Sequence, residues 1–465
     1  MLFYKLKIHF LSSYLLFHIS YIKDLWLFCA DKPDRLYYLL FAGYLCLFAW
    51  LITRLGFFKK SGLSNAQLVI LFLLKVMAGI FYGWIGIYYG QYAYMYDTWG
   101  YHYLSVDEYK MLFHSPSEYF FNVFHSGYEN KYGGFFSSDY SWWNDLKSNM
   151  FIKFLSLVNV FSFGNYYVNV IFYSFITFTG PVAIYRVFSD VFPGKKVHVL
   201  LATFLIPSFA YWTSGIHKDG LVFMAISLII YHVYFGLKEK KFRLFRIFPL
   251  FISFIIILSF RNFLLVILIP ALIAWILSTR IQKRNALIYI STYLICGLLF
   301  FSLRYIFPGL DFPQAVVDKQ KAFKILQGNS GIDLPELKPT IGSFLMNTPH
   351  ALSSTTLRPH PGDVKHILSM AAATETAFLL LLFFLFLFWR TNGVTSTSFI
   401  WFCVFFSFSF LLSIGFTVNF LGAIVRYRSI ILPFLLVPVI SLINWERIYS
   451  ILFNNIKNNS NVSDA

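Results

Sequence analysis

Long apolar runs separated by short polar breaks dominate the chain from residue 36 to residue 446. A helix needs about 20 apolar residues to cross a bilayer, so each run near this length predicts a membrane span. These runs cover residues 36–53, 66–90, 165–187, 197–214, 220–236, 245–260, 262–278, 286–304, 370–389, 398–416 and 428–446. The pattern predicts an all-α integral membrane protein with about eleven transmembrane helices, or twelve if a further run near the N-terminus also crosses.

That further run covers residues 8–29 and is interrupted by Lys23 and Asp24. A twelfth span and an amphipathic helix at the membrane interface fit it equally, whereas a cleaved signal peptide would need a small-residue cleavage site that is not evident. Three parts of the chain are thus predicted. They are the N-terminal span or spans with a cytoplasmic connection (1–65), a transmembrane core (66–446) and a disordered cytoplasmic tail (447–465).

The composition agrees with this class, because 58% of the 465 residues are hydrophobic and only 13% are charged. Phe, Tyr and Trp, at 57, 31 and 11 copies, supply lipid-facing bulk and the aromatic belts typical of membrane interfaces. The four cysteines, which show no C-x-x-C spacing, are Cys29, Cys46, Cys296 and Cys403. We therefore expect neither disulfides nor a cysteine metal cluster.

The formal net charge of +17 comes mainly from short basic connections between spans rather than from one soluble basic face. This distribution argues against a nucleic-acid partner and is typical of the positive-inside rule, which places basic loops in the cytoplasm. The basic connections alternate along the chain, at residues 54–60, 186–196, 237–246 and 278–284. The two long connections, 91–164 and 305–369, are therefore expected outside the cytoplasm, with amphipathic helices on the membrane surface.

The segment "GIHKDG" places His217, Lys218 and Asp219 at the outer boundary between two predicted spans. A solvated reverse turn would explain each of these residues alone. Three successive ionisable residues at this depth instead favour a protein cavity that binds a charged ligand, because such groups are costly near lipid. Lys218 would then contact a phosphate, and Asp219 would be the counter-charge that orients it.

Lys75 lies near the middle of the predicted span at 66–90, too far from either end to reach the headgroups easily. An ionisable residue at this depth is either functional or part of an ion pair with another helix. Glu375, in the predicted span at 370–389, is a conceivable partner. Both interpretations stay open from the sequence.

Three further motifs bring polar residues to the same outer side. The motif "YDTWGYH" contains Asp97 and His102, "LRPHPGD" contains Arg358, His360 and Asp363, and "IVRYRS" contains Arg426 and Arg428. Arginine binds phosphate oxygens in a planar, bidentate fashion, although an arginine at a span boundary also reaches headgroups and a single Asp also caps helices. A divalent cation is possible, but the adjacent carboxylates of Asp107 and Glu108 are a weak metal signal.

The order of these motifs resembles that in the C-type superfamily of polytopic membrane glycosyltransferases, in particular bacterial inner-membrane members with "PS…W.SG..KD" and "RP" segments. The resemblance runs from about residue 66 to residue 446 and implies a GT-C-like fold with extracytoplasmic amphipathic helices. It also implies transfer of a sugar from a polyprenyl-phosphate carrier, with Asp97 at the position of the acidic residue in the first catalytic loop. The chain departs in having at least one extra span before that loop and one acid where many members have two, which leaves metal dependence open.

The chemistry of the residues agrees with this resemblance. A departing lipid phosphate needs cations, for which the candidates are Lys218, Arg358, Arg426 and Arg428. Asp97 is the expected general base for an acceptor hydroxyl, with His102 second, and direct attack would invert the anomeric centre. We therefore expect a glycosyltransferase of the bacterial inner membrane that faces the periplasm or exterior. Its donor would be a polyprenyl-phosphate sugar, and its acceptor a glycan, lipid or protein.

Two other functions remain open. A polymerase or ligase for surface polysaccharide would also combine many spans with arginines that bind a lipid pyrophosphate. A flippase or transporter would have broken helices in paired inverted halves, and the sequence has no such symmetry. Coupling to nucleotide hydrolysis is not expected, because the chain contains no glycine-rich phosphate loop and no Walker lysine; G-x-S-x-G and H-E-x-x-H motifs are also lacking.

Overall fold

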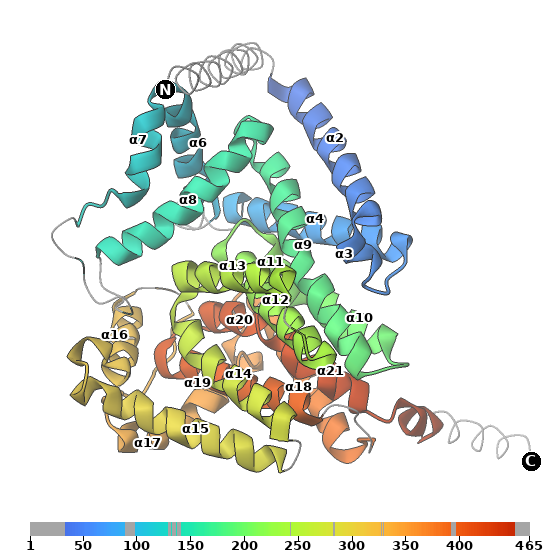
Figure 1. Ribbon diagram of the computed structural model, residues 1–465, viewed down its shortest axis with the longest axis vertical. Coiled ribbons are helices and arrows are strands. Elements are labelled where there is room, and N and C mark those ends of the chain that lie inside the picture. The colour runs from blue at the N-terminus through green and yellow to red at the C-terminus, as the bar shows by residue number, and fades with distance from the viewer. Residues whose placement is uncertain are drawn as a thin grey trace, which may run out of the picture. The chain divides into compact units, whose positions relative to one another are not determined.

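The computed structural model describes residues 33–88, 98–128, 132, 136, 141–241, 243–281, 284–326, 328, 330–391 and 397–451 (Figure 1). Within these ranges every named element is a helix, and the extended pairings are limited to two isolated bridges, Gly331 with Phe420 and Arg390 with Ile443. The predicted all-α class is therefore confirmed for this part of the chain.

Nine helices in the described ranges are long and apolar enough to cross a membrane. They are α2 (Pro33–Arg54), α4 (Asn65–Tyr88), α9 (Tyr166–Val191), α12 (Lys218–Glu239), α13 (Leu244–Arg261), α14 (Phe263–Ile281), α15 (Asn285–Ser302), α18 (Ile367–Phe388) and α19 (Thr397–Thr417). Each coincides with one of the predicted spans, which supports a multi-pass membrane protein.

The remaining two predicted spans, 197–214 and 428–446, fall on bent pairs of shorter helices. Helices α10 (Lys196–Phe204) and α11 (Pro207–Ser214) meet at 52°, and α20 (Leu421–Ser429) and α21 (Leu432–Leu442) meet at 66°. A proline lies in the first turn of each second helix, where its missing N–H costs nothing but the preceding helix cannot continue. The apolar pattern thus located both segments but not their bends.

The two bent pairs run antiparallel to each other. Helix α10 packs against α21 (Figure 1), and His198 of α10 stacks on Trp445, just beyond α21, at 5.9 Å between ring centres. At the opposite end, the Arg426 guanidinium of α20 lies 5.1 Å from the ring centre of Trp212 in α11. These contacts place the first half of one pair beside the second half of the other.

The chain divides into two compact units, and α9, α11 and α12 contribute residues to both. The first comprises residues 1–132, 140–178 and 214–218, and the second comprises 133–139, 179–213 and 219–465. Each is described by itself below.

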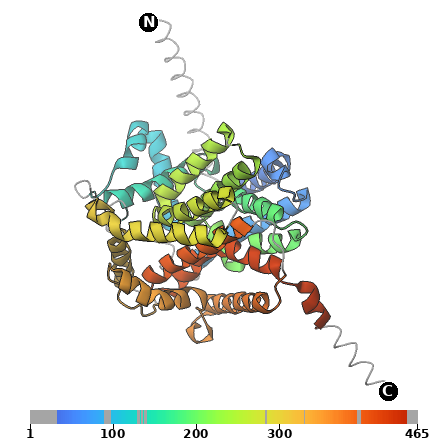
Figure 2. The same ribbon diagram turned by 60° about the horizontal axis from the view of Figure 1, so that its bottom comes forward.

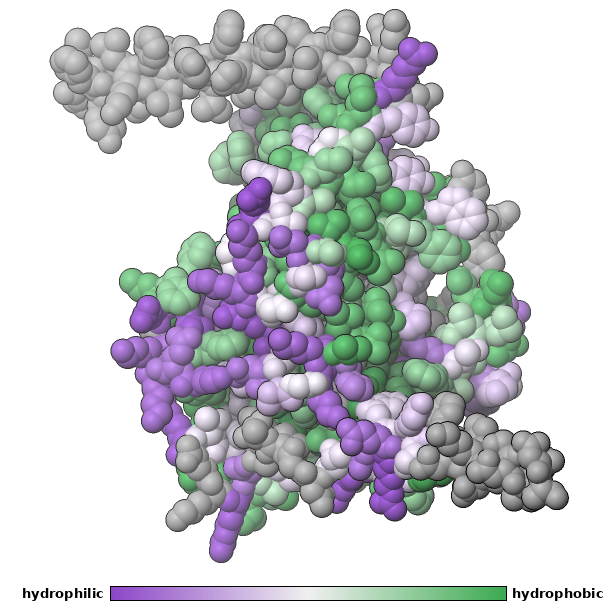
Figure 3. All heavy atoms as spheres, turned by 90° about the vertical axis from the view of Figure 1, so that its right-hand side faces the viewer, coloured by the Kyte–Doolittle hydropathy of each residue, from purple (hydrophilic) through white to green (hydrophobic). Residues whose placement is uncertain are grey.

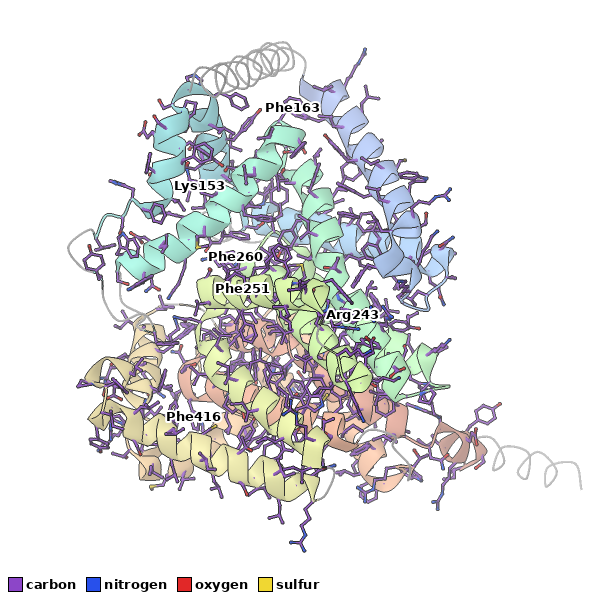
Figure 4. All side chains as sticks on the ribbon, in the orientation of Figure 1. Lys153, Phe163, Arg243, Phe251, Phe260 and Phe416 are labelled. Atoms are coloured by element: carbon purple, nitrogen blue, oxygen red, sulfur yellow. The ribbon has the colours of Figure 1, made fainter. Side chains whose placement is uncertain are left out.

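The first unit contains α2, α4 and three helices from the long connection at 91–164. These are α6 (Thr98–His114), α7 (Pro116–Phe121) and α8 (Trp142–Ser162), accompanied by the short helices α3 (Gly56–Lys59) and η1 (Asn122–Phe124). Helix α8 ends where Phe163 adopts a left-handed conformation (φ 52°), and Figure 4 labels this residue at the end of the helix. Helices were predicted in this connection, and they are present in its described residues.

Helices α6 and α8 pack closely and are joined by a partly buried ion pair. The Lys153 ammonium of α8, labelled in Figure 4, bonds to the Glu108 carboxylate of α6 and lies 3.8 Å from the ring centre of Tyr119. Glu108 also accepts a hydrogen bond from the Asn122 side chain at 2.7 Å. Because both charges have partners, this pair fixes the helices relative to each other. Glu108 is therefore engaged in structure rather than in a metal pair with Asp107.

The second unit is a bundle in which α14 contacts α15 and α19, and α17 (Ile341–Thr356) lies along α19 (Figures 1 and 2). The closest approach is at Gly415 of α19, where an added Cβ would lie 2.2 Å from the Ala351 carbonyl oxygen of α17. Helix α16 (Phe312–Ile325) and the short elements η2 (Leu303–Tyr305), η3 (Pro308–Leu310) and η4 (Pro361–Asp363) complete the unit. Its long connection at 305–369 is thus folded rather than extended.

The outer surfaces of the helices are strongly apolar. Figure 3 shows hydrophobic side chains exposed over a broad part of one face. Large side chains such as Tyr38 and Leu39 of α2 are 77% and 71% exposed, and Leu244 of α13 is 83% exposed. Surfaces of this kind are stable in lipid rather than in water, so they agree with the membrane assignment.

Candidate functional site

The second unit contains a buried carboxylate held by two arginines. Asp219, in the first turn of α12, is 0% exposed. Its Oδ1 accepts a hydrogen bond from Nη2 of Arg261 at 2.6 Å, and its Oδ2 accepts one from Nε of Arg426 at 2.7 Å. Three helices, α12, α13 and α20, thus supply one charged cluster. The N-terminus of α12 adds a favourable dipole for the carboxylate.

Aromatic rings surround the two guanidinium groups. The Arg261 guanidinium carbon lies 4.3 Å from the ring centre of Tyr427, and that of Arg426 lies 5.1 Å from the ring centre of Trp212. Stacking on aromatic faces holds arginine planes while leaving their edges available for hydrogen bonds. Nε of Arg261 is buried and has no hydrogen-bond partner among the described residues.

Lys319 of α16 adds a third cation to this environment. Its ammonium lies 5.3 Å from the ring centre of Phe323, whose ring in turn meets Tyr427 edge-on at 6.5 Å. Burial lowers the pKa of Lys319, an effect that Tyr427 opposes and the positive charge of Arg261 increases. In the part of the chain that the structure describes, Lys319 has neither a hydrogen bond nor an ion pair. We name Asp219, Arg261, Lys319, Arg426 and Tyr427 the arginine cluster.

The sequence predicted Asp219 and Arg426 as binding residues, and the structure brings them together. It did not predict Arg261, Lys319 or Tyr427. Arg261 could have been predicted from the sequence, because it ends one span and lies in a short polar turn on the predicted outer side. Lys319 could not have been predicted, since nothing in its local sequence distinguishes it from Lys321 on the same helix.

Arg428, also a predicted phosphate ligand, has a different role. Its Nη1 donates to the backbone carbonyls of Thr355 and Arg358, each at 2.9 Å, and its Nη2 donates to Oγ1 of Thr376 at 2.9 Å. Only 3% of the residue is exposed. Because both terminal nitrogens are used by protein acceptors, Arg428 joins α20 to the end of α17 and to α18. The structure thus favours a structural role over phosphate binding.

The polar side chains of the motif "LRPHPGD" bond mainly to groups within the motif. The Arg358 guanidinium makes two hydrogen bonds to Asp363, the one from Nε being 3.0 Å long, and the backbone N–H of His360 donates to the same carboxylate at 3.0 Å. These bonds, led by that from Arg358, hold the pKa of Asp363 below its ordinary value. The His360 ring accepts the N–H of Gly362 at 3.2 Å. All three predicted binding residues of this motif are therefore occupied with one another.

In the first unit, Lys218 contacts both α6 and α8, and His217 contacts α6. The Lys218 ammonium donates to Oγ of Ser148 at 3.3 Å and lies 5.2 Å from the ring centre of Tyr101. The His217 ring also meets Tyr101, at 5.9 Å, while its backbone carbonyl accepts the hydroxyl of Tyr173. The "HKD" turn therefore contributes to both units: Lys218 and His217 to the first and Asp219 to the second.

Lys75 is buried in α4, and its ammonium donates to Oγ of Ser214 at 3.4 Å. Helix α4 packs closely against the end of α11. A Cβ added at Gly79 would lie only 2.6 Å from the backbone oxygen of Ser214. The conceivable partner Glu375 has another role: its Oε2 accepts the backbone N–H of Ser208 at 2.7 Å. Lys75 therefore contacts the end of α11, just before the "HKD" residues.

His102, the second candidate base, is buried in a polar network. Its Nδ1 lies 3.4 Å from Nδ2 of Asn169, which donates to Oδ1 of Asn159 at 2.6 Å. Burial lowers the pKa of His102 to about 4, so the ring is neutral at physiological pH. This environment suits a structural role as a hydrogen-bond acceptor better than a role as a general base, which must exchange its proton with solvent. Asp97, the first candidate base, lies outside the described residues.

Metal binding was left open by the sequence. Within the described ranges, no group of three or more His, Cys, Asp or Glu side chains is arranged to hold a metal ion. Asp97 lies outside those ranges, so the question of a divalent cation stays open.

The arginine cluster is consequently the site with the clearest ligand chemistry. Two guanidiniums fix a buried carboxylate, and a third cation lies nearby without an ion pair to any residue that the structure describes. Such an arrangement can bind an anion that carries several oxygens. Comparisons with protein-family models, with curated proteins and with solved structures found no match to this chain.

Proposed function

We propose that this chain is a membrane glycosyltransferase that binds the phosphate of a polyprenyl-phosphate sugar at the arginine cluster and transfers the sugar to an acceptor. The observation that carries the proposal is Lys319, a half-buried cation next to Arg261 that has no ion pair among the described residues. Partial withdrawal of a cation from water is costly unless an anion accompanies it. A lipid-linked phosphate would supply that anion from the surrounding membrane.

The geometry supports a donor site rather than simple attraction of headgroups. Arg261 and Arg426 are fixed by the same carboxylate, at 2.6 and 2.7 Å, and each is stacked on an aromatic ring. Preorganised cations of this kind stabilise the negative charge that develops on a departing phosphate. Asp219 would therefore position the arginines rather than touch the ligand.

In the reaction, the acceptor oxygen attacks the anomeric carbon while the bond from that carbon to the phosphate oxygen breaks. The electron pair stays on the phosphate, which the arginine cluster stabilises, and the acceptor proton passes to a general base. Asp97 remains the candidate base on the resemblance stated above. Attack opposite the departing phosphate inverts the anomeric centre.

The antiparallel pair of bent spans favours a second candidate function, movement of a lipid-linked sugar across the membrane. Broken helices with opposite directions are typical of transporters, in which the breaks line the substrate path. Apart from Ser214 at the end of α11, both pairs, α10 with α11 and α20 with α21, lie in the unit that holds the arginine cluster. In this function the cluster would bind the same phosphate, but no glycosidic bond would form.

The proposal is tested by donor binding and turnover of the purified full chain in lipid nanodiscs, with a radiolabelled polyprenyl-phosphate hexose as probe. Lys319→Gln and Arg261→Gln should each weaken binding about ten- to a hundredfold, the effect of one lost charge-assisted bond to phosphate. Lys321→Gln is the matched control, because Lys321 lies on the same helix but is exposed. Equal affinity in all four proteins would contradict the assignment. Binding without sugar transfer, together with movement of the probe between leaflets, would favour the second candidate.

A further inference from the structure

A second group of charged side chains lies at the end of α12 opposite to Asp219. Glu239 is the last residue of this helix, so it lies roughly 30 Å along the helix from Asp219. Its Oε1 accepts a hydrogen bond from Nη2 of Arg246 at 2.5 Å, across the short connection to α13. The basic connections at 186–196 and 237–246 predict that this end faces the cytoplasm. The group is thus separate from the arginine cluster.

Three arginines share the Glu239 carboxylate. Besides Arg246, the positive charges of Arg186 in α9 and of Arg243, which Figure 4 labels just before α13, act on it. The Arg186 guanidinium bonds to the Tyr231 hydroxyl and has no ion pair among the described residues. The charge of Arg246 acts on the same tyrosine. We name Arg186, Tyr231, Glu239, Arg243 and Arg246 the Arg246 cluster. Three guanidiniums and one carboxylate leave it with an excess of positive charge.

Arg246 is the buried cation of this cluster. Only 5% of the residue is exposed, and the bond to Glu239 is its one hydrogen bond to the described part of the chain. Its Nε is buried without a partner there, as is Nδ1 of the neighbouring His232, on which the Arg246 charge acts. The nearby acid Asp190 is already paired with Lys238 at 2.6 Å. A guanidinium withdrawn from water with so few bonds indicates an anion that completes its bonding.

The apolar surface beside the cluster indicates the source of that anion. Leu244, Phe245 and Phe248, at the start of α13, are 83%, 58% and 67% exposed. A soluble phosphate would use the guanidiniums alone, whereas a phospholipid would also cover these side chains with its acyl chains. Guanidiniums bind phosphate oxygens in a bidentate fashion. Basic pockets between spans on the cytoplasmic side bind anionic headgroups.

We propose that the Arg246 cluster binds the phosphate of an anionic phospholipid from the cytoplasmic leaflet, with the acyl chains against the start of α13. The phosphate oxygens accept hydrogen bonds from Arg246 and Arg186, and Arg243 adds attraction from the exposed side. The bound lipid would link the end of α9 to the start of α13. This site does not depend on the proposed function, because Asp219 and the arginine cluster are at the other end of α12.

The proposal is tested by titrating the purified full chain in detergent with radiolabelled phosphatidylglycerol. Phosphatidylcholine with the same acyl chains is the net-neutral comparison. The salt concentration is about 1 M, where a Debye length of about 3 Å screens attraction to exposed charges. Arg246→Gln and Arg186→Gln should each weaken phosphatidylglycerol binding about ten- to a hundredfold, the effect of a lost charge-assisted bond. Glu239→Gln should strengthen it, because the carboxylate competes with the lipid for Arg246.

Lys241→Gln is the matched control, because Lys241 is exposed in the same connection. Its affinity should match that of the wild type. Equal losses in Arg246→Gln and Lys241→Gln would overturn the proposal, since they describe general attraction to a basic loop. Equal binding of the two lipids would also overturn it. Displacement of the lipid by inorganic phosphate at the same concentration would identify a soluble anion instead. If Arg246→Gln does not fold, Glu239→Gln decides, and unchanged or weaker binding would contradict the site.

Discussion

The imidazole of His102 lies against the rings of Trp99 and Tyr166, at 5.7 and 5.4 Å between centres, with Asn169 as its polar partner. Burial lowers the pKa of His102 to about 4, from 6.5 in an exposed histidine. The unfolded chain therefore takes up this proton before the folded chain does. Folding stability from the neutral ring is present above about pH 6.5 and is lost as the pH falls toward 4.

This linkage gives a prediction for His102→Gln, which keeps a hydrogen-bond acceptor but cannot be protonated. Wild type should lose about 3 kcal/mol of stability between about pH 6.5 and pH 4 that the variant does not lose. The measurement is thermal unfolding in detergent across that pH range. His114→Gln, an exposed histidine on the same helix, is the control. Parallel pH curves for wild type and His102→Gln would contradict the buried, neutral state.

Asp363 gives a second pH prediction with a different window. Its hydrogen bonds with Arg358 hold its pKa below the ordinary value, so their stabilisation is present above about pH 4 and is lost as the pH falls through the pKa of the folded state. Asp363→Asn should lower the unfolding temperature at neutral pH. The difference from wild type should vanish in strong acid. A difference that stayed constant with pH would mean that the carboxylate charge does not matter.

The role of Asp97 remains a prediction. Asp97→Asn should lower the rate of sugar transfer by about 10²–10⁴, the usual loss when a general base is removed, while donor binding survives. Transfer and binding are measured separately on the purified chain. Asp107→Asn serves as the control, because Asp107 is exposed and paired with Lys110. Near-normal turnover by Asp97→Asn would remove it from the mechanism.

At the residue scale, the sequence predicted which side chains are polar in an apolar setting, but not which of them meet. Asp219 and Arg426 were identified from their positions at span boundaries. Arg358 and Asp363 were identified on the same grounds, yet they bind each other. Lys319 could not be distinguished from its neighbours, because its burial depends on how α16 packs in three dimensions.

At the element scale, the helices depend on a few close approaches. Gly415 of α19 allows the Ala351 carbonyl of α17 to approach within 2.2 Å of the position where a Cβ would be. Gly415→Ala should therefore force the helices apart and cost about 1–3 kcal/mol. Thermal unfolding in detergent measures this.

The comparison for Gly415 is Gly297→Ala, in α15, where nothing lies within 4 Å of the added Cβ. This change should be neutral or stabilising by about 0.5–1 kcal/mol, since alanine favours helix interiors. Equal unfolding temperatures for the two variants would mean that α17 and α19 do not need their close contact.

Helix positions were predicted well, because apolar runs of span length leave few alternatives. The bends within two of the spans were not predicted. Apolar content is the same in a straight and a bent span, so hydropathy cannot detect the 52° and 66° angles. Pro207 and Pro433 were available as local signals, since proline ends a preceding helix. The antiparallel arrangement of the two pairs is a tertiary property that no local signal contains.

At the scale of the whole molecule, the basic connections predict which ends of the spans face the cytoplasm. In a variant with its four native cysteines replaced by serine, Glu336→Cys should react with an impermeant maleimide on intact cells. Lys240→Cys should react only after the membrane is opened. Both positions are exposed, so access is set by the membrane alone. The reverse pattern would invert the topology and move the arginine cluster to the cytoplasmic side.

The arginine cluster also has a consequence for how the chain is made. Asp219 enters the membrane with α12, and Arg261 follows 42 residues later, whereas Arg426 follows 207 residues later. At about 5–20 residues per second, Asp219 has Arg261 as its sole arginine partner for much of roughly 10–40 s before Arg426 arrives. Arg261 would thus neutralise the carboxylate during synthesis, before Arg426 is made. Loss of Arg261 should then reduce the yield of inserted protein more than loss of Arg426, even though both contact the same carboxylate in the finished molecule.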